Sequence, residues 1–130
     1  LRQLSFAILD MNWHNCNPIK VKSVKDFEAK ILETLTFTKD LEKTCMSTSF
    51  SHIFQGGYSA GYYSYKWAEV LDADAFEYFK EKGIFNKSIA SKFKNNILSK
   101  GGTEDPMDLY IKFRGRKPTI NALLKRSSIS

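Results

Sequence analysis

The sequence predicts an all-α protein, and three observations support this prediction. Apolar residues recur at intervals of three and four along most of the chain, the pattern of amphipathic helices. Several of these repeats begin after Ser, Asn or Asp and end at Gly, which are typical residues of helix ends. No pair of alternating strands joined by a hairpin turn occurs, nor any internal repeat. We therefore expect several helices joined by short turns.

The first part of the chain is expected to contain two helices and an irregular segment. Ser23 can cap the second helix, whose apolar face continues to Leu35. From Cys45 to Gly57, Ser and Thr residues and a Gly pair interrupt any periodicity, which predicts irregular backbone. The first helix is expected to end near residues 15–18, and four residues form its apolar stripe: Leu1, Leu4, Ile8 and Met11.

A long helix is expected from about Tyr58 to Lys82. Gly83 follows it and can adopt the left-handed conformation that commonly ends a helix. Three aromatic residues of this helix are core candidates: Phe76, Tyr78 and Phe79. Most of its acidic residues are expected to be solvated or paired with Lys66 or Lys80, and none is given a catalytic role: Glu69, Asp72, Asp74 and Glu77.

Capping residues mark the remaining helices. Asn86 is expected to cap one helix, which ends before Gly101. The pair Asp105–Pro106, a capping carboxylate followed by Pro at the first helical position, predicts the start of another helix. Gly115 ends that helix, and Thr119 is expected to cap a last short one.

Size and charge limit the class of protein. A chain of 130 residues fits one domain or a piece of one, and no apolar run approaches the ~20 residues of a membrane span. Ten of the 20 basic residues, but only three acidic ones, lie in residues 87–130. This basic excess fits a solvated surface or a nucleic-acid contact, and the spacing of its lysines among apolar residues favours the solvated surface.

Two cysteines indicate no disulfide scaffold, so we expect a reduced, cytoplasmic setting.

The segment from Phe50 to Trp67 is the candidate site. It contains one His, a double Gly and four Tyr residues. On a helix, Tyr58, Tyr62 and Tyr65 would share one face because they are four and three residues apart. Phenols are neutral hydrogen-bond donors, so several of them beside a His suit the binding of peptide carbonyls and of an oxyanion. The same spacing also fits core aromatic residues with solvated hydroxyls.

These residues resemble a known family. The run Phe50-Ser-His-Ile-Phe-x-Gly-Gly-Tyr-x-Ala-Gly-Tyr-Tyr-x-Tyr65 resembles the C-terminal part of the thimet-oligopeptidase family of zinc metallopeptidases. The spacing of six positions from His52 to Tyr58 is most similar to the spacing in its bacterial peptidyl-dipeptidase (dipeptidyl carboxypeptidase) branch. The resemblance continues to Pro118, is weaker at residues 1–3 and 10–14, and is poorest at residues 20–44. It implies that residues 1–130 form the multi-helical C-terminal part of a larger zincin-type catalytic domain.

The resemblance also implies roles for individual residues. The parent enzyme would hydrolyse short peptides and release C-terminal dipeptides. His52 would bind the substrate backbone near the scissile bond, and Tyr65 would donate a hydrogen bond to the oxyanion. Four further residues are implied in substrate binding: Gly56, Gly57, Tyr58 and Tyr62.

The zinc ligands of that family are missing from this chain. The family binds zinc through a His-Glu-x-x-His helix and a further Glu, whereas the only histidines here, His14 and His52, are 38 residues apart. We therefore expect a C-terminal fragment that binds no zinc and cleaves no peptide by itself. The parent would hold the zinc, and the remainder of the same catalytic domain would be the partner of this chain.

The sequence allows three interpretations other than a peptidase fragment. The leading alternative is a stand-alone basic helical module that binds nucleic acid through residues 87–126. A structural zinc at His14, Cys16, Cys45 and His52 is disfavoured because these spacings match no common zinc module. A DNA minor-groove arm at residues 114–118 is disfavoured because the segment lies between two expected helices.

Overall fold

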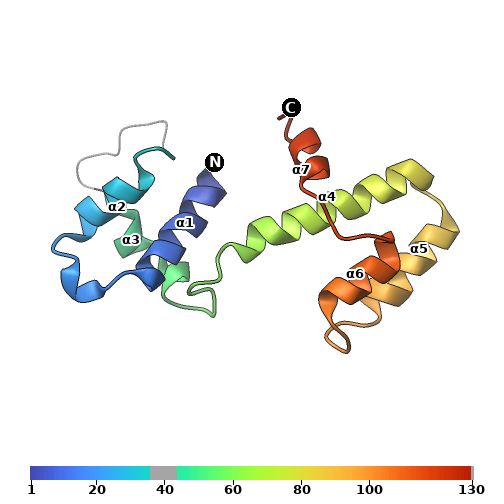
Figure 1. The fold of residues 1–130 in the computed structure, drawn as a ribbon, viewed down its shortest axis with the longest axis horizontal. Helices are drawn as coiled ribbons and strands as arrows, with labels where there is room; N and C mark the ends of the chain where they lie inside the picture. The colour runs from blue at the N-terminus through green and yellow to red at the C-terminus, as the bar shows by residue number, and fades with distance from the viewer. Residues whose placement is uncertain (36–43, 130) are drawn as a thin grey trace. The chain divides into compact units, whose positions relative to one another are not determined.

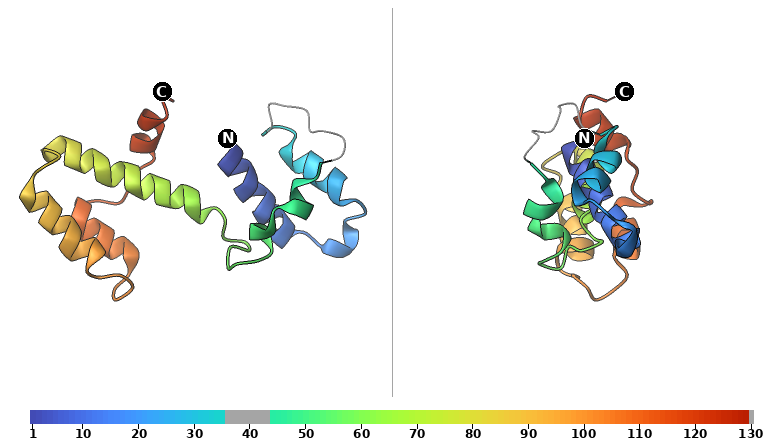
Figure 2. Two further views of the ribbon diagram at one scale, coloured as in Figure 1. Left: turned by 180° about the vertical axis from the view of Figure 1, so that it is seen from behind. Right: turned by 90° about the vertical axis from the view of Figure 1, so that its left-hand side faces the viewer.

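The computed structural model describes residues 1–35 and 44–129, and Figures 1 and 2 show its helices. These residues form helices and turns without any strand, which confirms the all-α prediction. None of the described helices combines the length and the apolar character that crossing a membrane requires. Residues 36–43, within the stretch that resembles the family least, lie outside the described residues. The chain divides into two compact units, Leu1–Lys66 and Trp67–Ser130.

The described residues of the first unit before Ser64 form these helical elements: α1 (Arg2–Asn15), η1 (Pro18–Lys20), α2 (Val24–Leu32), α3 (Met46–Ser49) and η2 (Ser51–Ile53). The prediction for Ser23 is confirmed, because its side chain accepts a hydrogen bond from the backbone N–H of Asp26 at the start of α2. The segment that we expected to be irregular contains the single turns α3 and η2. Local helical turns of this length carry too few residues for a periodic pattern.

The buried face of α1 differs from the predicted one. The stripe of Leu1, Leu4, Ile8 and Met11 is exposed. Leu9 and Asp10 are instead completely buried. Periodicity identifies the more apolar side of a helix, but the neighbouring segments decide which side is covered. Here α1 turns its Leu9 and Asp10 side toward the segment that follows α3, as the hydrogen bonds of Asp10 show.

The second unit contains most of α4 (Ser64–Lys82), then α5 (Lys87–Phe93), the π-helical turn η3 (Lys94–Leu98), α6 (Pro106–Arg114) and α7 (Asn121–Arg126). In Figures 1 and 2, α5 and α6 lie side by side. The core forms around the completely buried Phe113 of α6, which packs with Ala75, Ile89 and Tyr110. Tyr78 and Phe79 pack against this core as predicted, whereas the prediction for Phe76 is wrong because it is exposed.

Most predicted helix ends of this unit are confirmed. Asn86 accepts hydrogen bonds from the backbone N–H groups of Ser88 and Ile89, and Asp105 caps α6 in the same way. Gly83 and Gly115 adopt φ angles of 98° and 86° at the ends of α4 and α6. The prediction for Thr119 is wrong. The cap of α7 is Ile120, which makes no side-chain capping bond.

Candidate functional site

The predicted site residues all lie in the first unit, on three kinds of local structure. His52 is on η2, Gly56 and Gly57 follow it in a turn, and Tyr65 lies in the first turn of α4. The expected helix from Tyr58 does not form, because residues 58–63 make successive turns and α4 begins only at Ser64. The proximity of the phenols therefore has a different cause from the helical spacing that we expected.

Six aromatic side chains collect into a ring cluster: Phe6, Phe50, His52, Tyr58, Tyr62 and Tyr65. The imidazole of His52 stacks on Phe50, with 5.2 Å between the ring centroids, and lies 5.6 Å from the ring of Tyr58. The rings of Tyr58 and Tyr65 stack at 5.4 Å, and Tyr62 lies 5.0 Å from Tyr65. The structure thus brings together the His and the three Tyr residues that the sequence singled out.

The members of the ring cluster differ in exposure. Tyr62 is 7% exposed, and Phe6 and Phe50 contact its ring from α1 and from the end of α3. Tyr65 is 37% exposed, and His52 is also exposed. The buried Tyr62 and the partly buried Phe6 and Phe50 therefore form a base that carries a polar face made by His52, Tyr58 and Tyr65.

The double Gly is required by backbone conformation. Gly56 and Gly57 have φ angles of 74° and 77°, in the left-handed region where a Cβ atom is unfavourable. Space is not the reason, because a Cβ atom at Gly57 would meet no atom within 4 Å. Two consecutive residues of this kind reverse the chain between His52 and Tyr58, which places the two rings next to each other.

Asp10 of α1 binds the turn that follows Tyr58. Its carboxylate accepts hydrogen bonds from the backbone N–H groups of Ala60 and Tyr62, each at 2.9 Å. Its Oδ1 atom also lies 3.0 Å from Nδ1 of His14, one helical turn away. Ala60 has a φ of 55°, a conformation that residues with a Cβ atom adopt rarely.

A second buried carboxylate, that of Glu28 on α2, holds the start of α3. It accepts hydrogen bonds from the backbone N–H groups of Met46 and Ser47 and from the hydroxyl of Ser47. These bonds and the one from the Cys45 thiol lower the pKa of Glu28 and outweigh the opposing effect of burial. The hydroxyl of Ser47 in turn accepts a hydrogen bond from the indole of Trp13 at 2.8 Å. Glu28 and Trp13 thus connect α3 to α2 and α1.

The hydroxyl of Tyr65 is kept protonated by its neighbour. A side-chain hydrogen bond with Tyr58 raises the pKa of Tyr65, and partial desolvation and the nearby phenol of Tyr62 act in the same direction. Because an unperturbed phenol already has a pKa of about 10, Tyr65 is a neutral hydrogen-bond donor at pH 7.

The sequence did not reveal the supporting residues. Asp10 fell only within a weak part of the family resemblance, and nothing singled out Phe6 or Glu28. An acidic residue on an amphipathic helix is normally solvated, and its burial here depends on backbone N–H groups 50 and 52 residues away. Local sequence carries no signal for such a contact.

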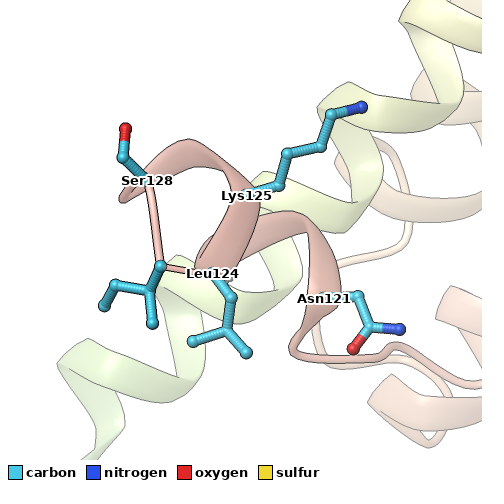
Figure 3. A pocket seen from close by; sticks show the side chains of 5 residues that line it. Asn121, Leu124, Lys125 and Ser128 are labelled. Atoms are coloured by element: carbon cyan, nitrogen blue, oxygen red, sulfur yellow. The ribbon is translucent and has the colours of Figure 1, made fainter.

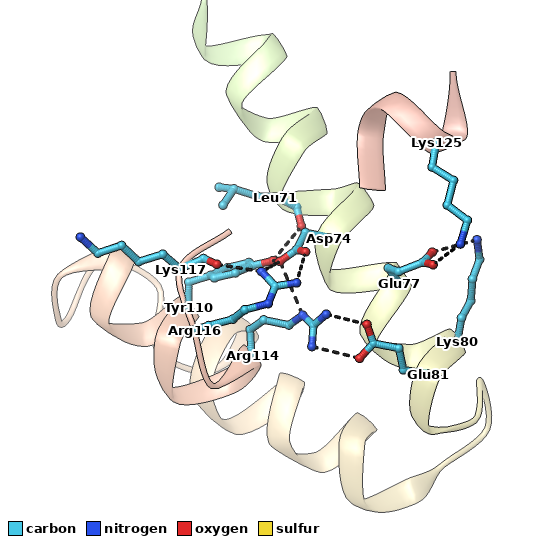
Figure 4. Close-up of polar contacts among 10 residues, drawn as sticks. All are labelled: Leu71, Asp74, Glu77, Lys80, Glu81, Tyr110, Arg114, Arg116, Lys117 and Lys125. Carbon is cyan, nitrogen blue, oxygen red and sulfur yellow. Dashed lines mark hydrogen bonds and ion pairs between the residues drawn. The ribbon is translucent and has the colours of Figure 1, made fainter. Parts of the chain in front are cut away.

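The second unit holds a charged network around Asp74, and here the prediction for the acidic residues is wrong in one case. Asp74 is only 1% exposed and accepts hydrogen bonds from the Tyr110 hydroxyl and from both terminal nitrogens of Arg116 (Figure 4). Arg114 lies beside it and forms two hydrogen bonds with Glu81. Among the other acidic residues, Glu77 has a lysine partner as expected: it binds Lys80 and also Lys125 (Figure 4).

These pairs bear on the nucleic-acid alternative. Several basic residues of the second unit bind carboxylates of the same unit: Lys100, Lys112, Arg114, Arg116, Lys125 and Arg126. A pocket beside α7 also offers little to an anion, since its Lys125 extends away from Leu124 and binds Glu77 (Figure 3). Six of the ten basic residues in residues 87–130 thus bind carboxylates of the same unit.

The described residues do not fit a zinc site. Within residues 1–35 and 44–129, no group of three or more His, Cys, Asp or Glu side chains lies close enough to hold a metal ion. His14 is engaged by Asp10, and the ring of His52 belongs to the ring cluster. The ring cluster can bind and orient a polar substrate, but its side chains supply no metal-ligand set.

Comparisons with known proteins identify the family. Over 136 residues, the chain is 49% identical to oligopeptidase A of Escherichia coli (strain K12), an alignment that covers 99% of this chain and 19% of that protein. Identity is 36% with dipeptidyl carboxypeptidase of the same organism, covering 98% of this chain and 19% of the relative. It is 33% with thimet-like oligopeptidase of Dictyostelium discoideum, covering 96% and 18%. The chain thus spans about a fifth of the length of these curated relatives.

The match extends over the whole site. Peptidase family M3 matches residues 1–129, a range that includes Asp10, the ring cluster and the Asp74 network. Identity is higher with oligopeptidase A than with dipeptidyl carboxypeptidase, the branch that the spacing of His52 and Tyr58 suggested. The resemblance to the thimet-oligopeptidase family is confirmed, and this chain belongs to peptidase family M3.

Proposed function

We propose that this chain supplies the substrate-binding wall of a zinc metallopeptidase that hydrolyses short peptides. One observation carries the proposal: His52, Tyr58 and Tyr65 form a polar face on a base made by the buried Tyr62 and the partly buried Phe6 and Phe50. Membership of peptidase family M3 supports the reaction class. The zinc ligands would come from another part of the catalytic domain, because the described residues contain no such set and the chain spans only about a fifth of its relatives.

Each residue of the polar face has a proposed task. The imidazole of His52, exposed on η2, binds a backbone group of the peptide near the scissile bond. The Tyr65 hydroxyl donates a hydrogen bond to the oxyanion that develops when the scissile carbonyl is attacked. Tyr58 contacts the substrate beside it. Gly56 and Gly57 let the turn between His52 and Tyr58 pass close to the peptide.

Tyr62 takes a supporting part in this polar face. Its ring is buried between Phe6, Phe50 and Tyr65, so it supports the face from below. The raised pKa of Tyr65 agrees with its proposed task, because a hydrogen-bond donor to an oxyanion must be protonated.

The mode of cleavage has two candidates. The spacing from His52 to Tyr58 favours the release of C-terminal dipeptides, and a relative named dipeptidyl carboxypeptidase is 36% identical. The alternative is the cleavage of peptides at internal bonds, and the higher identity is with oligopeptidase A, a name that gives oligopeptides as the substrates without limiting cleavage to dipeptide release. Matched peptides with a free and an amidated C-terminus distinguish the two modes, because only dipeptide release depends on the free carboxylate.

The substitution Tyr65→Phe tests the proposed role of the phenol. In the complete enzyme, we expect kcat to fall by about 10²–10³, the usual loss for one oxyanion donor, with little change in KM. Tyr63→Phe is the matched control, because Tyr63 is exposed and two residues away but is outside the ring cluster. An unchanged kcat for Tyr65→Phe would remove Tyr65 from the mechanism.

The isolated 130-residue chain provides a second test. We expect it to cleave no peptide and to bind no catalytic zinc, since its described residues gather no metal-ligand set. Metal-dependent peptide hydrolysis by the purified chain would contradict the proposal.

A cytoplasmic location is also proposed, supported by the free thiols of Cys16 and Cys45.

A further inference from the structure

The turn that carries Tyr62 depends on one buried side chain. Asp10 is completely buried and points both carboxylate oxygens at backbone N–H groups: Oδ1 at Ala60 and Oδ2 at Tyr62, each at 2.9 Å. Burial of a carboxylate is unfavourable unless its charge is well paired and hydrogen-bonded. Two backbone donors and the neighbouring His14 supply that compensation.

The bound turn is one that the chain does not favour by itself. Ala60 has a φ of 55°, which brings its Cβ atom too close to the backbone in any residue other than Gly. The turn is further connected by backbone hydrogen bonds from Gly61 to Tyr58 and from Tyr65 to Tyr62. An unfavourable conformation persists where surrounding contacts determine it, and the contact here is the Asp10 carboxylate.

Displacement of this turn would move the proposed site. Tyr62 contacts the ring of Tyr65 at 5.0 Å, and Tyr65 stacks on Tyr58 at 5.4 Å. The backbone N–H of Tyr65 donates to the carbonyl oxygen of Tyr62, so a shift of Tyr62 is passed directly to the first turn of α4. A misplacement of about 1 Å at a reacting group can cost about 10² in rate.

We infer that Asp10 is a positioning residue of the peptidase: its carboxylate fixes the Ala60–Tyr62 turn and thereby places the hydroxyl of Tyr65. Asp10 does not touch the substrate and acts through Tyr65. This inference rests on the proposed function, in which Tyr65 binds the oxyanion. Beyond the proposed function, it assigns a role to a buried carboxylate that lies 55 positions before Tyr65 in the chain. Both oxygens of this carboxylate must accept hydrogen bonds.

The substitution Asp10→Asn tests the inference in the complete enzyme. Asn has nearly the same shape but a single acceptor oxygen, so its amide group must face one of the two backbone N–H groups. We expect kcat to fall by about 10–100-fold, with KM changed less than about twofold. In a Tyr65→Phe background, the same substitution should cost less than about threefold, because the hydroxyl that it misplaces is already absent.

Glu28→Gln is the matched control. Glu28 is also a buried carboxylate that accepts backbone hydrogen bonds, but those come from Met46 and Ser47. The substitution Glu28→Gln should reduce kcat by the same factor in the wild-type background and in the Tyr65→Phe background. An equal factor for Asp10→Asn in both backgrounds, or an unchanged kcat, would overturn the inference and assign Asp10 a role in stability alone.

Two further measurements test the inference if Asp10→Asn does not fold or if the enzyme shows no activity. If Asp10→Asn does not fold, Ala60→Gly is added, because Gly adopts the left-handed conformation readily. This double variant should show the same dependence on Tyr65, and equal factors overturn the inference. Amide hydrogen exchange of residues 58–66 does not depend on activity and should be at least about tenfold faster in Asp10→Asn than in Glu28→Gln. If the wild type cleaves no peptide, the proposed function fails, and equal exchange rates would also refute the positioning of the turn.

Discussion

We expect the substitution Asp74→Ala to lower the free energy of unfolding by about 1–4 kcal/mol, because a buried carboxylate that accepts hydrogen bonds from several donors is removed. Asp74 lies on α4 and is 1% exposed. Its carboxylate is the shared acceptor for a phenol and two guanidinium groups of the same unit (Figure 4). Replacement by Ala leaves all three donors in place without their acceptor.

The contacts of each donor set this magnitude. The buried hydroxyl of Tyr110 loses a 2.8 Å hydrogen bond and keeps only a longer one, 3.4 Å, to the carbonyl oxygen of Leu71, and a poorly satisfied buried group costs about 1–3 kcal/mol. Arg114, whose side chain is 7% exposed, loses a 3.5 Å ion pair but keeps both bonds to Glu81. Arg116 is 42% exposed, so water can replace its lost acceptor, and it contributes no more than about 1 kcal/mol.

Urea unfolding of the 130-residue chain, followed by circular dichroism, measures the loss. Asp72→Ala is the matched control, because Asp72 lies on the same helix and pairs with Arg126 at 2.6 Å, but is 67% exposed. That exposed pair should contribute about 0.2–1 kcal/mol. A loss for Asp74→Ala no larger than the loss for Asp72→Ala would refute the argument that burial of the carboxylate makes the network stabilising.

Two further predictions concern the same unit. Burial and the hydrogen bond with Asp74 raise the pKa of Tyr110 far above its usual value, so its contribution to stability is complete below a pH of about 10 and decreases as the pH rises above that value. Unfolding free energies measured at increasing alkaline pH should therefore decrease less steeply for Tyr110→Phe than for the wild type, and parallel curves would contradict this. Gly115→Ala should cost about 1 kcal/mol through its φ of 86° alone, since no atom lies within 4 Å of the added Cβ. Gly102→Ala, where the surroundings are equally open but φ is not in the left-handed region, should cost much less in the same urea unfolding assay.

Most features that depend on a few neighbouring residues were predicted correctly, with the cap at Thr119 as the exception. Ser23, Asn86 and Asp105 cap helices because a capping side chain binds backbone N–H groups only two or three residues away. Gly83 and Gly115 end helices for an equally local reason. The site residues were also found, but through a family resemblance and a helical spacing that the turns of residues 58–63 replace.

The amino-acid sequence by itself determined the helical class, the helix caps and the identity of the aromatic residues near the double Gly. Only the tertiary structure decided which face of α1 is buried, and that Asp10 and Asp74 are interior charges. The physical reason is distance along the chain: the donors that stabilise these carboxylates are 36 to 52 residues away. The same holds for the ring cluster, whose members come from α1, the end of α3, η2 and the start of α4, and meet only when the first unit folds.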